Sequence, residues 1–310
     1  MRDSLAALAA TALVHSLAAA QEPEPKNAVA QEPEAKTADA QDREAQTADT
    51  QEPEAESADK IARELANPNT PMATLNFKFQ FRSYEGNLPD ADDQFSSTLL
   101  FQPSMPFPLD NGDLFFFRPA IPIQIHQPVF DAGERGFDSR FGLGDITFDL
   151  AYGRTTPSGL VLAAGLVSTV PTATSSELGG GRLTVGPELL IAKLGKNYVL
   201  GVFPSHQWDV AGWTDKSVNV TNLQLFATLL PGGGWNVGSS PTFSYDWGSD
   251  QWTIPININV GQTVIRDGQP WKLSVEINYF VEKSDSFGMK WFVGVNIAPV
   301  VENALAKLFK

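Results

Sequence analysis

Strict alternation of apolar and polar residues constrains this fold more than any other feature of the sequence. In "TLNFKFQFRSY", residues 74–84, Phe77, Phe79 and Phe81 fall on one face of an extended chain. Lys78 and Arg82 fall on the other face. From residue 73 onward no amphipathic helix of useful length appears. Instead, about twelve alternating segments follow, near 74–84, 94–103, 113–125, 139–153, 159–170, 181–194, 197–209, 217–230, 234–247, 251–262, 270–282 and 288–301.

The length of these segments separates the two β folds that show such alternation. Strands of a soluble sandwich are usually about 5–6 residues long. The segments here run about 10–14 residues, which is the length that a tilted strand needs to cross a bilayer. An open sheet edge is not tolerated in hydrocarbon, so the sheet has to close on itself. The sequence therefore predicts an all-β transmembrane up-and-down antiparallel β-barrel of about 12 strands over residues 73–301.

The connectors between the segments alternate in length. "EGNLPDADD", "HQPVFDAGERGFD" and "PTATSSELGG" are longer than most of the intervening set, which includes "RTTPS", "LGKN" and "PGGG". Long outside loops and short periplasmic turns are typical of outer-membrane barrels. With an even number of strands, both ends of the barrel are expected on the periplasmic side of a Gram-negative outer membrane.

The first 72 residues differ from the rest in composition. Residues 1–20 have a positive start at Arg2, an apolar run and an A-x-A site at Ala18 and Ala20, which predicts a secretory signal peptide. Residues 21–60 are four acidic decapeptide repeats, of which the first is "QEPEPKNAVA". Their polar, acidic composition predicts a disordered tether. Residues 61–72 are expected to form a short helical or coil lead-in, and residues 302–310 a C-terminal tail.

Charge and cysteine content exclude several classes of function. The formal net charge is −14, and residues 21–60 hold 12 acids and 4 bases, hence −8 of it. Binding to nucleic acid requires many Lys and Arg residues, so no nucleic-acid partner is expected. The chain has no cysteine, which excludes disulfides and thiolate metal sites. We expect neither a metal nor a cofactor.

Tryptophan placement supports the membrane prediction. Five of the seven Trp residues share the parity of apolar positions and lie near segment ends, as in the aromatic girdles that flank the lipid-facing band of a barrel. They are Trp235, Trp247, Trp252, Trp271 and Trp291. On this reading Phe77, Phe79 and Phe81 face lipid.

The opposite parity places a set of polar residues inside the barrel. Two interpretations of them stay open: the charges pair and hold the interior together, or they line a permeation path with a field across it. The expected lumen-facing residues are Lys78, Arg82, Arg118, Asp145, Asp149, Glu188, Asp246, Asn257, Asn259, Lys272, Glu276, Asn278 and Asn296.

Signals for catalysis are weak. Asp145 and Asp149 share a face but lie about 13 Å apart at the rise of a strand, too far for an acid–base pair. Downstream of the leader the histidines are His126, in an expected loop, and His206. Ser205 precedes His206, so the two side chains point to opposite faces. We expect no catalytic residues and no enzymatic activity.

Several longer blocks resemble a known family. "ELANPNTPMATLNFKFQF", "LLFQPSMPFPL", "FGLGDITFDLAYG" and "GPELLIAKLG" are similar to bacterial outer-membrane proteins labelled after the meta-pathway of phenol degradation, some of which carry the name neuromedin U. The resemblance covers about residues 61–301. It implies outer-membrane passage of small, possibly aromatic or hydrophobic compounds, and it assigns no residue roles.

Together these features predict a porin-like channel or transporter for small molecules. Its expected partners are membrane lipid, small solutes and the barrel assembly machinery, with the oligomeric state open. One alternative is a closed structural or lipid-binding barrel. An outer-membrane lipid hydrolase is a third possibility.

Overall fold

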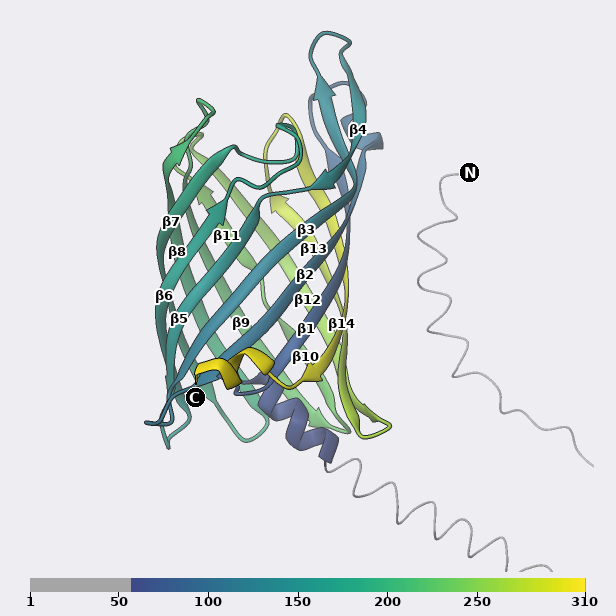
Figure 1. Ribbon diagram of the computed structural model, residues 1–310. Coiled ribbons are helices and arrows are strands. Elements are labelled where there is room, and N and C mark those ends of the chain that lie inside the picture. The colour runs from purple at the N-terminus through teal and green to yellow at the C-terminus, as the bar shows by residue number, and fades with distance from the viewer. Residues whose placement is uncertain (1–56, 310) are drawn as a thin grey trace, which may run out of the picture. The chain divides into compact units, whose positions relative to one another are not determined.

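The computed structural model describes residues 57–309, which fold as a closed antiparallel β-barrel (Figure 1). Residues 57–66 are helical and precede the barrel. The 3₁₀ turns are η1 (Ala91–Asp93) and η2 (Ala304–Phe309). The strands are β1 (Ala73–Glu85), β2 (Phe95–Pro108), β3 (Leu114–Asp131), β4 (Gly136–Leu143), β5 (Ile146–Thr155), β6 (Leu160–Val170), β7 (Arg182–Leu194), β8 (Tyr198–Gly212), β9 (Asn219–Gly232), β10 (Trp235–Ser239), β11 (Thr242–Asp246), β12 (Gln251–Arg266), β13 (Gln269–Glu282) and β14 (Gly288–Val301).

The fourteen segments make twelve barrel strands, as the sequence predicts. β4 and β5 both pair with β3, and β10 and β11 both lie between β9 and β12, so each of these pairs fills one position. The barrel closes where β1 pairs with β14, from Ala73 opposite Val301 to Glu85 opposite Gly288. The prediction of a closed up-and-down barrel is therefore confirmed.

The two ends of the barrel differ. We call the end with residues 57–66, the start of β1 and the end of β14 the helix end, and the opposite end the loop end (Figure 1). No strand connector at the helix end is longer than residues 109–113. At the loop end the connectors include residues 86–94 and 171–181. Two expected boundaries were wrong. β2 continues past residue 103 to Pro108. β3 continues past residue 125 to Asp131 in a hairpin with β4, where Phe130 and Phe137 pack edge to face at 5.2 Å.

The outer surface carries an apolar band. Large apolar side chains recur at every second position of neighbouring strands, as expected for strands with one face in lipid. Isolated exposed apolar residues are common on soluble proteins, whereas a continuous band marks contact with an apolar medium. Members of the band are Leu223, Leu225, Leu229, Ile256, Ile258, Val260, Leu273, Val275 and Ile277, all more than a third exposed. Within residues 57–309, no helix is long and apolar enough to span a membrane.

Two interruptions of the wall affect the interior. Between β10 and β11, Ser240 N–H donates to Asn257 Oδ1 at 2.7 Å, and Pro241 has no N–H to donate. Between β4 and β5, Asp145 accepts backbone N–H bonds from Ala173 at 3.0 Å and Gly180 at 2.7 Å. The first interruption leaves Ser240 facing the interior, and the second ties the 171–181 loop to the wall.

The segment before β1 departs from the expected boundaries. The expected signal peptide and residues 21–56 of the expected tether lie outside the described residues. The helix at 57–66 begins within the stretch assigned to a disordered tether. Ala58 and Ala62, one turn apart, are buried, so an apolar contact orders this part of the polar repeat. Pro68 follows the helix, where it cannot continue it.

Candidate functional site

The lead-in segment, residues 57–72, lies across the helix end of the barrel (Figure 1). Asp59 Oδ1 accepts the backbone N–H of Gly234, in the β9–β10 turn, at 2.6 Å. Asn69 Nδ2 donates to Thr155 Oγ1, at the end of β5, at 2.9 Å. These two anchor points are several strands apart around the rim, so the segment passes over the mouth between them.

The segment contributes to the lining of two cavities inside the barrel. The apolar chamber, about 240 Å³, lies against β2 to β9. The polar chamber, about 310 Å³, lies against β9 to β14 and β1. Ala66 of the lead-in segment and Ser240 at the β10–β11 interruption line both chambers, so the chambers meet at these two residues.

The apolar chamber combines aromatic rings with one ion pair. Phe116, Phe203 and Phe226 contribute to its wall. Arg118 on β3 and Asp149 on β5 occupy opposite positions of the ladder, with Arg118 Nη2 at 2.5 Å and Nε at 2.7 Å from Asp149 Oδ2. Paired side chains on adjacent strands stabilise a sheet when their charges are opposite. The charge of Arg118 is thus balanced by an acid on the adjacent strand, and not by an acid on the far side of the lumen.

Glu188 adds a second acid to this chamber. It lies on β7 and is only 3% exposed, and the negative charge of Asp149 acts on it. Arg118 is the base whose charge acts on it. Two acids therefore share one guanidinium in a largely apolar wall, an arrangement that depends strongly on Arg118.

The polar chamber has a different wall, in which hydrogen-bonding groups replace the aromatic rings. Its charged residues are Lys78 on β1 and Lys272 and Glu276 on β13. Lys78 Nζ donates to Gln102 Oε1 at 2.7 Å. The remaining polar lining comes from Asn76, Thr228, Asn236, Ser240, Asn259, Ser274 and Asn296. Such a wall suits a hydrophilic solute or a charged group.

Eight of the thirteen residues expected in the lumen line one of the two chambers. The strand alternation places them on the inner face, and the register gathers them by half-barrel. Three lie in the apolar chamber and five in the polar chamber: Arg118, Asp149 and Glu188 in the first, and Lys78, Asn259, Lys272, Glu276 and Asn296 in the second.

The other five expected lumen residues make local contacts. Arg82 donates to Gln80 Oε1 at 2.6 Å, and Asn257 Nδ2 donates to Asn278 Oδ1 at 2.9 Å. Asp145 holds the 171–181 loop, as described above. Asp246 accepts the N–H of Gly248 at 2.8 Å, so it caps the turn after β11.

Sequence reasoning did not single out the inward-facing rings or the lead-in residues. Phe116 has the same parity as Arg118, two positions along β3, so the alternation carried a signal for its direction. For Ala66 and Pro68 no such signal existed, because they precede the first strand. Their position depends on contacts with turns far along the chain.

The five Trp residues assigned to the girdle lie at or near strand ends. Trp235 begins β10, Trp247 follows β11, and the other three lie close to the ends of β12, β13 and β14. Four of the side chains are at least 44% exposed: Trp235, Trp247, Trp252 and Trp291.

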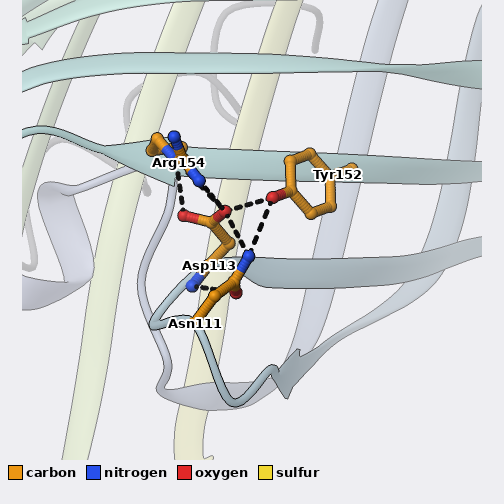
Figure 2. A network of polar contacts seen from close by, with 4 residues as sticks. All are labelled: Asn111, Asp113, Tyr152 and Arg154. Atoms are coloured by element: carbon orange, nitrogen blue, oxygen red, sulfur yellow. Dashed lines mark hydrogen bonds and ion pairs between the residues drawn. The ribbon is translucent and has the colours of Figure 1, made fainter.

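A polar network joins the β2–β3 turn to the end of β5 at the helix end of the barrel (Figure 2). Asp113, in the β2–β3 turn, accepts Arg154 Nε on Oδ1 at 2.8 Å and Arg154 Nη2 on Oδ2 at 2.7 Å. The Tyr152 hydroxyl also donates to it, as does Asn111 Nδ2 at 2.9 Å. The Arg154 guanidinium, followed by the Tyr152 hydroxyl, lowers the pKa of the Asp113 carboxyl to about 2.

The histidines lie away from both chambers. His206 Nδ1 is 2.7 Å from Thr221 Oγ1, and the ring packs against Trp208 at 4.1 Å. Ser205 occupies the other face of β8. His126, within β3 rather than in a loop, stacks on Phe95 at 4.3 Å. Among residues 57–309, no group of three His, Asp or Glu side chains is arranged to hold a metal ion.

Comparison with known proteins gives structural but not sequence relatives. No protein-family model matches the chain, and no curated protein sequence matches it. The COG4313 outer membrane channel from Pseudomonas putida F1 superposes with a TM-score of 0.56 at 15% identity, covering 74% of this chain and 94% of that one.

Two further structures show lower scores. The NanC porin has a TM-score of 0.47 at 9% identity, covering 74% of this chain and 99% of that one. Outer membrane phospholipase A from Escherichia coli has a TM-score of 0.43 at 11% identity, covering 73% and 89%. At such identities the likeness concerns the fold alone. The superposition on the COG4313 channel and the closed antiparallel sheet show that the chain has the fold of an outer-membrane β-barrel.

Proposed function

We propose that this protein is an outer-membrane channel or transporter for small molecules. The observation that carries the proposal is the pair of chambers inside one closed barrel, which share Ala66 of the lead-in segment and Ser240 of the wall. A barrel that serves only as a scaffold has no need of two lined cavities, whereas a path for a solute requires polar groups and space inside. The outward apolar band supplies the contact with lipid.

The apolar chamber supports small aromatic or hydrophobic compounds as solutes. Phe116, Phe203 and Phe226 line this chamber, and aromatic side chains of this kind favour contact with a flat apolar molecule. The Arg118–Asp149 pair supplies the few fixed polar groups that orient a ligand in a mostly apolar site. We propose no enzymatic activity for the chain. His206 Nδ1 contacts the Thr221 hydroxyl, and neither residue lines a chamber.

The proposal places the helix end in the periplasm and the loop end outside. The longer connectors at the loop end support this orientation. An epitope inserted within residues 132–135 should then be accessible to antibody on intact cells, and one within residues 195–197 only after permeabilisation. Equal labelling of the two insertions on intact cells would overturn the orientation.

Single-channel recording in a planar bilayer tests transport directly. We expect discrete conductance steps from the purified barrel, reduced in the presence of a small aromatic solute that occupies the apolar chamber. A silent barrel that nevertheless keeps heat-modifiable mobility on a gel would contradict the proposal. It would favour the closed structural or lipid-binding barrel, which the anchoring of the lead-in segment across the mouth supports.

A further inference from the structure

Lys272 is an unusual residue of the barrel interior. It lies on β13, and its side chain lines the polar chamber. Within residues 57–309, no hydrogen bond or ion pair involves its ammonium group. A charge held inside a protein without a partner is costly, so such a group is normally paired or binds something.

The neighbouring charges do not compensate Lys272. The charge that acts on it is that of Lys78, another cation. Glu276 is the acid of this chamber, and its charge acts on Lys78 and Arg82. One acid is therefore shared by two bases, while Lys272 has none. The lining contains two ammonium groups and one carboxylate, an excess of one positive charge.

The neutral groups of the chamber complete a site for an oxyanion. Asn236 is 8% exposed, and within residues 57–309 no hydrogen bond involves its side-chain amide. This amide lies in the same wall as the Ser274 hydroxyl, whereas the Nδ2 groups of Asn76 and Asn259 already donate to Gln102 O and Ser240 Oγ. Amide N–H and hydroxyl groups near an ammonium are the donors that a carboxylate accepts from.

We propose that the polar chamber binds a small organic carboxylate through Lys272, with the apolar part of the ligand directed into the apolar chamber. The chambers meet at Ala66 and Ser240, and Phe116 and Phe226 line the apolar side. An aromatic monocarboxylate matches both halves, whereas an inorganic anion matches only the polar one. The inference rests on the proposed function, because a ligand enters only if the lumen opens.

Isothermal titration of the folded, detergent-solubilised full chain with benzoate, benzamide and benzylamine tests the inference. We expect benzoate to bind tighter than the neutral and cationic analogues, and tighter than inorganic phosphate. Lys272→Met should weaken benzoate binding about tenfold or more, as for loss of a charged hydrogen-bond partner. Lys272→Arg should retain most of it.

A variant of opposite sign makes the test sharper. Glu276→Gln removes the acid of the chamber, so it should tighten benzoate binding several-fold and weaken any benzylamine binding. Lys196→Met, an exposed lysine in the β7–β8 turn, is the matched control and should change neither. If Lys272→Met fails to fold, Lys272→Arg and Glu276→Gln still decide the matter.

Two outcomes would overturn the inference: benzoate affinity unchanged in Lys272→Met, or phosphate or benzylamine bound as tightly as benzoate by the parent. Conductance is measured separately. Benzoate binding with the expected variant pattern in a barrel that never conducts would refute transport alone. A conducting barrel that does not bind benzoate would refute this inference alone.

Discussion

The two halves of the barrel interior differ in whether their charged side chains have ion-pair partners. On the β2–β9 side, Arg118 and Asp149 face each other across one ladder and lie in contact. On the β9–β1 side, Lys272 lines a chamber whose acid, Glu276, acts on Lys78, so Lys272 has no ion-pair partner within residues 57–309. The first arrangement pairs its charges within the wall, and the second leaves one cation without an ion-pair partner.

The largest expected effect comes from releasing the lead-in segment, which lines both chambers at Ala66. Asp59 and Asn69 anchor the lead-in segment to the rim. The double variant Asp59→Ala, Asn69→Ala should release it and merge the chambers, raising single-channel conductance roughly twofold or more, since the constriction sets the current. Asn303→Ala is the control, because Asn303 also bonds the helix-end rim, to Pro106 O at 2.6 Å, from outside this segment. Equal conductance in both variants would mean that the segment is not the constriction.

The next effect concerns the paired half. Arg118→Met leaves Asp149 and Glu188 without their base and should lower the free energy of unfolding by about 1–3 kcal/mol, between the values for exposed and fully buried pairs, because Arg118 is 40% exposed to the lumen. Denaturant titration of the folded barrel in micelles measures it. The double variant Arg118→Met, Asp149→Leu should recover part of the loss. No recovery would show that packing, and not the charge, caused it.

The same half of the barrel has an ion pair at the helix-end rim, between Asp113 and Arg154, and its contribution to stability depends on pH. Because the pKa of Asp113 is lowered to about 2 in the folded barrel, its contribution to stability is complete above the ordinary carboxyl value of 3.8 and disappears as pH falls from there toward 2. Asp113→Asn should therefore lower the melting temperature at pH 6 and differ less from the parent at pH 2. Asp110→Asn, in the same turn, should follow the parent curve. A constant difference between Asp113→Asn and the parent across this range would contradict the assignment.

The smallest expected effect is on the unpaired half. Lys272→Met removes a charge that has no partner within residues 57–309, so the unfolding free energy should change by less than about 0.5 kcal/mol or rise slightly. The measurement is the same denaturant titration as for Arg118→Met. A loss of unfolding free energy as large as that of Arg118→Met would contradict the claim that charges are paired in one half and unpaired in the other.

The alternation of residues predicted the faces of the strands but not which inward residues meet. Lys78 and Arg118 have the parity of lumen residues, and that much follows from the two-residue period of a strand. The contact between Arg118 and Asp149 depends on the register between β3 and β5, with all of β4 between them in the chain. Register is fixed by turns and bulges whose geometry the sequence does not spell out.

The lead-in segment shows a second limit. Residues 57–60 continue an acidic repeat whose composition is typical of disorder. Their helix is ordered by contacts of Ala58 and of Asp59 with a turn about 175 residues later in the chain. Composition describes what a segment does alone, so it cannot anticipate a long-range partner. For the same reason the separation of the lumen into two chambers was not predictable.

The pairing of Ala73 with Val301 has a consequence for how the chain is made. The seam joins the first strand to the last, so the contact order of the fold is high. A chain that lacks β14 cannot form a closed barrel. Until β14 arrives, β1 exposes a free row of N–H and C=O groups that any other strand can extend. Such an edge is a template for misassembly in water and is not tolerated in hydrocarbon. We therefore expect another surface to cover the edge of β1 until β14, which ends at Val301, has paired with it. Closure of the barrel is then the step that completes folding.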